Sequence, residues 1–528
     1  MTHTKSASMP PKHPRCCPCG ERPAPAGSSL TRRDFLKGAG VTALGSAALS
    51  GLTWPLSAGQ VTAAASGIHS PRPLKVKPIL VYDTPQRRHQ TSWRNWGGIE
   101  TEAQAREEVV RIRGELTALT RKAEFPLDVL PVSPVRKAGD LAGVRDIEAA
   151  DALVVYAAGG WLDVFDALDK TGKDRILFCR HKSGPVYLWY EIISPRYLRK
   201  HGDSLAAKGV DEDDVVIDSQ DEILWRLRAL AGLRNAIGTK VLAIGGPAAW
   251  SEPEGSGSVV KSVIETWKLD IATVSYDDLG GLIRRARADE AAVRRAKSRA
   301  EDYLRLPGTS LETQRSFVEN GLLLDEVFRA LMKEAGARAL TINGCMGTIM
   351  PLAETSACLT LSTLNDDGYL AFCESDFVVI PSGILLAAIA GRPVFLNDPT
   401  YPHDGIITLA HCTAPRKMDG RSAEPARILT HFESDYGAAP KVEMRRGQIL
   451  TNIAPDFASQ RWLGLRAEIA DAPFLPICRS QIDVRYKCDD LTLARRMPGF
   501  HWMTAYGDYT REIGYALRRV GIAWDFLG

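Results

Sequence analysis

Apolar residues in the first half of the chain alternate between short unbroken runs and stretches with helical spacing. The unbroken runs predict buried strands at residues 74–82, 127–132, 152–157 and 175–179. The stretches between them predict helices, the first of which begins after Thr101, a favoured capping residue. Strands that alternate with helices in this way are typical of a parallel sheet.

The same alternation restarts after residue 238. A strand and a glycine turn at 239–247 are followed by a predicted helix at about 310–335, a strand at 339–342 and a helix at about 348–364. Two further apolar runs, at 369–373 and 393–397, predict adjacent buried strands joined by a helix at 377–390. From about residue 406 the runs become short and alternating, at 406–409, 426–432, 441–444 and 448–453, with a predicted hairpin turn at 445–447.

We therefore predict an α/β protein with two consecutive doubly wound parallel-sheet domains and a β-rich C-terminal domain. The expected boundaries are a leader at 1–65, a linker at 66–73, α/β domains at 74–238 and 239–398, and the β-rich domain with a final helix at 399–528.

The leader contains Arg32 and Arg33, followed by Phe-Leu-Lys, a mildly apolar region and the small residues 63–65. This order resembles a twin-arginine (Tat) export signal, with cleavage expected near Ala65. The apolar region is interrupted by Gly45, Gly51 and Pro55, which makes it a poor membrane span. The expected location is periplasmic or otherwise extracytoplasmic, with the Tat machinery as a partner.

Composition and charge narrow the range of functions that we expect for this chain. The chain has 528 residues and a net charge of +3, without a basic stripe interleaved with aromatic residues, so we expect no nucleic-acid partner. Gly245 and Gly246 follow a strand, but neither a dinucleotide nor a phosphate-loop motif surrounds them. Three of the ten cysteines lie in the leader, and the remaining scattered seven do not suggest a disulfide framework.

Two acids, Glu374 and Asp398, stand at the predicted exits of the two adjacent apolar strands. Ligands of open α/β sheets bind at that edge. Carboxylates joined by imidazoles form an oxygen and nitrogen site for a divalent metal of the Mn/Mg kind. Each residue alone also has a structural explanation, such as a helix cap, a turn residue or a core histidine.

Three segments carry a family resemblance: Cys373-Glu374-Ser375-Asp376, the segment 391–398 that ends in Asp398, and the late Gly499-Phe500-His501. Together they resemble the C-terminal half of the L-fucose isomerase/L-arabinose isomerase superfamily. Glu374 and Asp398 are 24 positions apart, as that resemblance requires. It implies Mn²⁺ held by Glu374, Asp398 and His501, and a C-terminal antiparallel barrel. His411 stands where arabinose isomerases, but not typical fucose isomerases, have another histidine ligand.

The resemblance also implies a homo-oligomer, a trimer or hexamer, with shared active sites. A loop bearing Trp93 and Arg94 would then reach a neighbouring subunit's sugar; the alternative is a surface loop held by buried tryptophans. His431, on a strand with a polar tip, is a second candidate sugar contact, and an ordinary surface strand pair is its alternative.

The expected function is an exported, Mn²⁺-dependent aldose–ketose isomerase in which Glu374 and Asp398 move the proton through an enediol. Two alternatives stay open. One is a non-catalytic extracytoplasmic carbohydrate-binding protein, and the other is a metal-assisted enzyme that acts on polyols or sugar acids.

Overall fold

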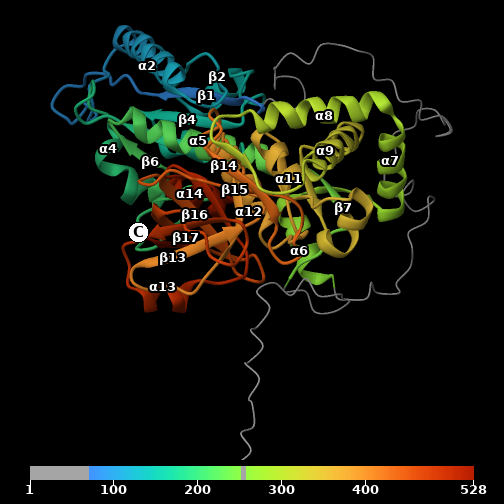
Figure 1. Ribbon diagram of the computed structural model, residues 1–528. Coiled ribbons are helices and arrows are strands. Elements are labelled where there is room, and N and C mark those ends of the chain that lie inside the picture. Colours follow the sequence, from blue (N-terminus) through green and yellow to red (C-terminus); the bar gives the residue numbers. More distant parts are fainter. Residues whose placement is uncertain (1–70, 251–256) are drawn as a thin grey trace, which may run out of the picture.

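The first part of the chain forms a parallel sheet with the strand order β2-β1-β4-β5-β6, and β3 pairs with the far end of β1. Figure 1 labels β1, β2, β4 and β6 of this sheet. This is a computed structural model that describes residues 71–250 and 257–528. The strands are β1 Leu74–Val81, β2 Leu127–Val129, β3 Ser133–Val135, β4 Ala152–Ala157, β5 Asp174–Cys179 and β6 Val215–Ile217. The helices are α2 Glu102–Lys122, α3 Leu162–Asp169, α4 Trp189–Ile192 and α5 Gln220–Ala236, with short helical turns at Ala138–Gly143, Ile193–Leu198 and Glu212–Asp214.

Both faces of this sheet are buried, which explains the unbroken apolar runs. Successive residues of β4 enter two different core clusters, Val154 with the residues of α2 and α5, and Val155 with those of α3. Thr101 caps α2 as expected, because its side chain accepts the Gln104 N–H. A strand covered on both sides by helices cannot show polar alternation.

A second parallel sheet has the strand order β11-β10-β7-β8. Its strands are β7 Lys240–Ile244, β8 Asp270–Val274, β10 Ala339–Ile342 and β11 Leu370–Phe372. Its helices are α6 Ser258–Trp267, α7 Tyr276–Ala288, α8 Glu290–Leu304, α9 Arg315–Ala335, α10 Met350–Ala353, α11 Cys358–Asp366 and α12 Ile380–Ala390, with a π-helical turn at Cys345–Ile349. The single helix expected at 348–364 is therefore broken between α10 and α11, where Glu354 has a positive φ of 49°.

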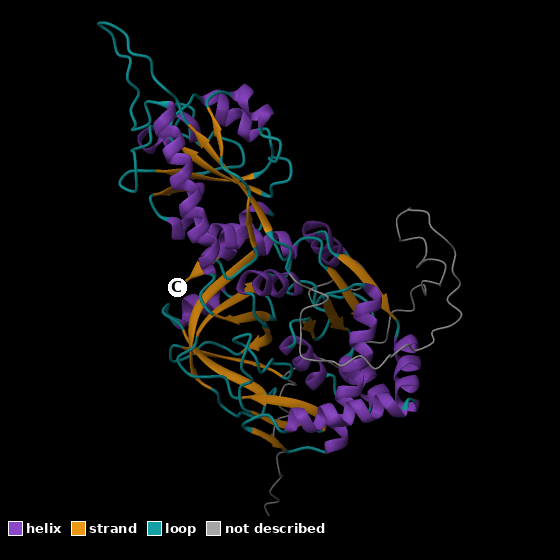
Figure 2. Cartoon of the chain, turned by 90° about the horizontal axis from the view of Figure 1, so that it is seen from above, coloured by secondary structure: helices purple, strands orange, loops and turns teal. Residues whose placement is uncertain are grey.

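The C-terminal part contains a closed antiparallel barrel of six strands, in the order β16-β19-β12-β13-β18-β17, closed by pairing of β17 with β16. The barrel strands are β12 Phe395–Pro399, β13 Ile406–His411, β16 Ile449–Pro455, β17 Arg461–Asp471, β18 Ser480–Arg485 and β19 Trp502–Tyr506. Strand β20, Ala523–Leu527, adds to β17 in parallel, and the helices here are α13 Asp490–Arg496 and α14 Thr510–Arg519. Figure 2 shows the strands gathered in sheets with the helices packed around them.

The structure corrects two expectations about strand pairing. Strand β12 is not a neighbour of β11 in a parallel sheet; it pairs antiparallel with β13 and β19, so the expected boundary at 398–399 falls inside a barrel strand. The predicted hairpin at 445–447 is also wrong. The strands before and after it belong to different sheets, since β15, Tyr436–Val442, pairs with β14, Ala426–His431, which in turn pairs with β9, Thr309–Leu311.

Helix α5 of the first unit packs directly on α12 and α14 of the rest of the chain. A Cβ atom added to Gly232 of α5 would lie 2.2 Å from the Ile389 side chain and 3.1 Å from its backbone. The lack of a side chain at Gly232 therefore sets the distance between α5 and α12. One continuous core runs through the two parallel sheets and the barrel.

The predicted leader at 1–65 and most of the linker lie outside the described residues, so the export signal stays a prediction. In the described part of the chain, every helix is too short or too polar to cross a lipid bilayer.

Candidate metal centre

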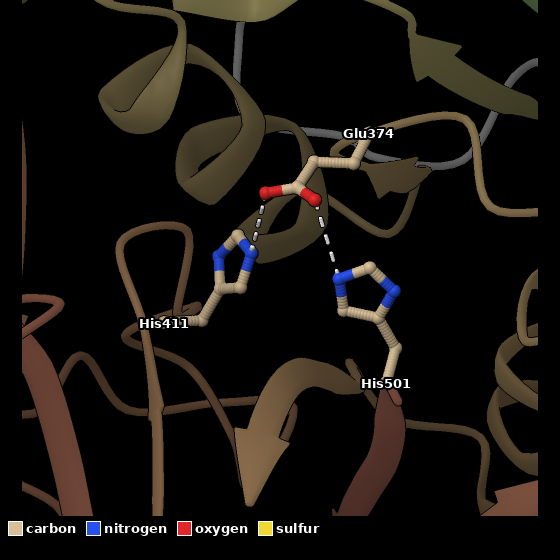
Figure 3. Close-up of side chains that lie close together, drawn as sticks. All are labelled: Glu374, His411 and His501. Carbon is tan, nitrogen blue, oxygen red and sulfur yellow. Dashed lines mark ion pairs between the residues drawn. The ribbon is translucent and has the colours of Figure 1, made fainter. Parts of the chain in front are cut away.

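Glu374 lies in a tight turn between β11 and α12, at the carboxyl end of the second parallel sheet. Glu374 and Ser375 have φ values of 66° and 46°, a left-handed conformation that costs ~1–3 kcal/mol per residue outside glycine. The turn is held by the Ala248 N–H, which donates to the Ser375 carbonyl at 3.2 Å. This conformation directs the Glu374 carboxylate toward the barrel, where it lies between the imidazoles of His411 and His501 (Figure 3).

His501 reaches this carboxylate from the barrel side, directly before β19. The preceding Gly499 has φ 72°, and a Cβ there would lie 2.1 Å from the Pro455 carbonyl oxygen, so the approach to the strand requires glycine. The His501 Nε2 atom is 3.3 Å from Glu374 Oε2 and 3.3 Å from Asp398 Oδ1.

Asp376 fixes the other edge of this imidazole. The Nδ1 atom of His501 is 2.8 Å from Asp376 Oδ2, and both side chains are buried. The second oxygen of Asp376 accepts the Val378 N–H at 3.2 Å, at the start of the segment that leads into α12. A carboxylate accepts only, so Nδ1 carries the proton and a neutral ring keeps its Nε2 lone pair for a ligand.

His411 is the last residue of β13 and completes the group. Its Nε2 atom is 3.7 Å from Glu374 Oε1, and its Nδ1 atom is 3.1 Å from the Thr413 hydroxyl. The barrel pairs β12 with both β13 and β19, which brings residues 411 and 501 together although they are far apart in the sequence.

Asp398 lies inside β12, opposite Ala410 of β13, and not at a strand exit as we expected. Its Oδ1 atom is 3.3 Å from His501 Nε2, and its charge also acts on His411. The structure thus places the three predicted ligands Glu374, Asp398 and His501 beside one another, and it places His411, the additional candidate, in the same group.

The charges of this group favour bound positive charge. Burial raises the pKa of Glu374, but the two histidines outweigh that effect and hold it well below its usual value. Burial lowers the pKa of His411, but Glu374 and the charge of Asp398 raise it to about 9. The pKa of His501 is also well above its usual value, because Asp376 and Glu374 outweigh the effect of burial.

The donor atoms fit a divalent cation. One donor atom each from Glu374, His411 and His501 lies within 4.8 Å of the others. Glu374 Oε2 and His501 Nε2 are buried and 3.3 Å apart, and among the described residues neither forms a hydrogen bond, a costly arrangement unless another group binds them. Carboxylate and imidazole donors suit Mn²⁺, and Fe²⁺ and Zn²⁺ share part of that preference.

The other predicted contacts do not belong to this donor group. His431 ends β14, and its Nδ1 atom is 3.1 Å from the Ser434 hydroxyl. Arg94 lies over the Trp93 ring at 5.0 Å and pairs with Glu100 at 3.1 Å, in the loop between β1 and α2. Since the expectation for this loop concerned a neighbouring subunit, it stays a prediction.

Sequence reasoning missed the aromatic wall beside His501. Trp250, in the loop after β7, is 5.1 Å from the Phe500 ring and 6.0 Å from the His501 ring, measured between centroids. Phe500 could have been found from its place next to His501, but Trp250 is 251 positions earlier and carries no local signal.

Comparison with protein-family models gives no match for this chain, and a search of curated proteins finds no similar sequence.

Proposed function

We propose that the chain is an exported, metal-dependent aldose–ketose isomerase. The observation that carries the proposal is the convergence of Glu374, His411 and His501, with Asp398 beside them, on one buried point between a parallel sheet and a barrel. The order of these residues in the chain is the order that suggested the isomerase superfamily. Two consecutive doubly wound domains and export through the Tat pathway belong to the same proposal.

A bound divalent cation, Mn²⁺ in this proposal, would stabilise negative charge on two adjacent oxygens of the sugar. Glu374, His501 and His411 would hold it, and Asp398 would contribute from β12. The chain's own residues would do the remaining work. A carboxylate of Glu374 or Asp398 would take the proton from one carbon and return it to the next, help that is typically worth ~10²–10⁴-fold in rate.

The aromatic wall of Trp250 and Phe500 would face the less polar side of a sugar ring or chain and limit the access of water to the proton. Asp376 would keep the His501 ring in one orientation during turnover. The left-handed turn at Glu374 and Ser375 would keep the Glu374 carboxylate in place. The conformational free energy that this turn costs would be offset by contacts in the surrounding fold.

The test is a screen of aldoses by NMR for ketose formation, with the Mn²⁺-loaded protein and with the variant Glu374→Gln. The variant should lose turnover and remain folded. Glu354→Gln is a matched control, because Glu354 is 60% exposed and pairs with Arg287 away from the centre; it should keep full activity.

Chelator treatment separates the enzyme from the carbohydrate-binding alternative. An isomerase of this kind should lose activity when the metal is removed and regain it with Mn²⁺. Tight sugar binding that survives chelation, without any product, would instead support a binding protein. Near-normal isomerase activity of Glu374→Gln would refute the mechanism.

A further inference from the structure

Three thiols meet beside His411. Cys412 follows His411 directly, Cys358 begins α11, and Cys478 lies in the loop before β18. Together with Ala439 they form a small cluster that is separate from the two large cores. Free cysteine packs as a small apolar residue, so the fold does not require cysteine at these three positions. The proposed isomerase does not require it either.

Cys412 is the central thiol of this cluster. Its sulfur accepts the Arg479 N–H at 3.4 Å, and the thiols of Cys358 and Cys478 both form hydrogen bonds with it. Cys412 thus has two sulfur neighbours already in contact. A disulfide forms only between cysteines that can bring their sulfur atoms to ~2.0 Å without large backbone movement.

Cys478 is the better partner of the two. Cys358 is 3% exposed and is fixed at the first residue of α11, next to the fully buried Ala357. Cys478 is only partly buried and lies in the irregular segment between β17 and β18. A loop residue can move toward Cys412 at a lower cost than a residue inside a packed helix.

We propose that Cys412 and Cys478 are a peroxide-oxidisable pair that closes to a disulfide. The thiolate of Cys478, the more accessible of the two, attacks hydrogen peroxide, the O–O bond breaks, and a sulfenic acid and hydroxide form. The hydroxide takes up a proton to become water. The Cys412 sulfur then attacks the sulfenic sulfur of Cys478, the S–O bond breaks, and a second water leaves. Two thiols are oxidised and one peroxide is reduced to two waters.

Closure of this pair acts on the candidate metal centre, and this step rests on the proposed function. Cys412 stands between His411 and Thr413, whose hydroxyl is 3.1 Å from His411 Nδ1. Since hydrogen-bonded sulfur atoms are farther apart than disulfide-bonded ones, closure requires movement; the loop residue Cys478 makes most of it, and the new bond also pulls on the backbone that carries His411 and Thr413. Disturbing the partners of a ligating histidine typically weakens metal binding ~10–100-fold, and we expect a weakening of about tenfold here.

The test treats the reduced full-length protein with hydrogen peroxide and maps disulfides by mass spectrometry. The expected product is a Cys412–Cys478 crosslink, absent in Cys478→Ser and retained in Cys358→Ser. Mn²⁺ titrations followed by EPR should show weaker binding after oxidation of the wild type and of Cys358→Ser, and no change in Cys478→Ser.

Absence of the crosslink, or a crosslink of Cys412 with Cys358 instead, would overturn the assignment of the pair. A crosslink that leaves Mn²⁺ affinity unchanged would overturn its coupling to His411. If the reduced protein does not bind Mn²⁺, the metal centre itself is refuted, while the crosslink map still decides whether the dithiol exists.

Discussion

His501 and Asp376 are 125 positions apart in the sequence, yet their Nδ1 and Oδ2 atoms lie 2.8 Å apart in a buried contact. The contact joins the barrel to the turn after β11. It decides which nitrogen of His501 faces Glu374, because the proton must sit on the nitrogen that faces Asp376.

Replacing Asp376 with asparagine should weaken Mn²⁺ binding by ~10–100-fold. Asparagine keeps the size of the side chain and can still accept the Val378 N–H, but it no longer places a negative charge beside the imidazole. Isothermal titration of the variant with Mn²⁺ measures the loss. Wild-type affinity in a folded Asp376→Asn protein would show that Asp376 does not position the ligand.

Replacing His411 with glutamine should weaken Mn²⁺ binding by about tenfold or more, since the chain would lose an imidazole donor that faces Glu374. His431→Gln is the matched control. His431 is also buried and also contacts a hydroxyl, but it lies on β14 outside the donor group. EPR titration should separate the two variants, and equal affinities would remove His411 from the ligand set.

Replacing Gly232 with alanine should destabilise the protein by ~1–3 kcal/mol, because the added methyl group overlaps Ile389 of α12. The control is Gly114→Ala in α2, where an added Cβ meets nothing within 4 Å. That variant should gain ~0.5–1 kcal/mol from the higher helix propensity of alanine. The urea midpoints of the two variants should therefore move in opposite directions. If Gly232→Ala leaves the midpoint unchanged, α5 and α12 separate easily.

Asp218 should give the fold a pH-dependent contribution. Burial raises its pKa, but the Ser183 hydroxyl and the N–H groups of residues 181–183 outweigh burial and lower it to about 2. A depressed pKa contributes stability above the unfolded value of about 3.8, and the contribution is lost as pH falls toward 2. Asp218→Asn should cost on the order of 1–2 kcal/mol at pH 7.

That cost should shrink as the pH is lowered toward 3. Urea unfolding of the wild type and of Asp218→Asn at several pH values between 3 and 7 measures the difference. A difference that is independent of pH would mean that shape, and not the charge of Asp218, holds the loop at 181–183.

The sequence predicted two parallel sheets and most of their strands, but it missed β6 and β8 and misplaced β12. An apolar run such as residues 393–397 has the same pattern in a parallel strand and in a barrel strand, because both are buried on each side. One of its partners, β13, follows after a short connection, but the other, β19, begins more than a hundred residues later, and nothing local encodes that second pairing. The boundary between sheet and barrel was misplaced for this reason.

The candidate site shows the same limit. Glu374, Asp398 and His501 were found through their order and spacing, whereas the geometry of Asp398 was misjudged because its strand was misplaced. Asp376 follows Glu374 by two positions and was expected on the first turn of the next helix, but α12 begins only at Ile380, and the contact of Asp376 with His501 could be named only from the structure. The left-handed turn at Glu374 and Ser375 has no sequence signal, since neither residue is glycine or asparagine.

Glu374 belongs to the parallel sheet and His501 to the barrel, so any cation bound between them would connect two structural units that fold by different pairings. Its binding energy would add to the energy that holds those units together. Amide hydrogens of β11 and β19 should then exchange more slowly with deuterium when Mn²⁺ is present, whereas those of β4 in the first sheet should exchange at an unchanged rate.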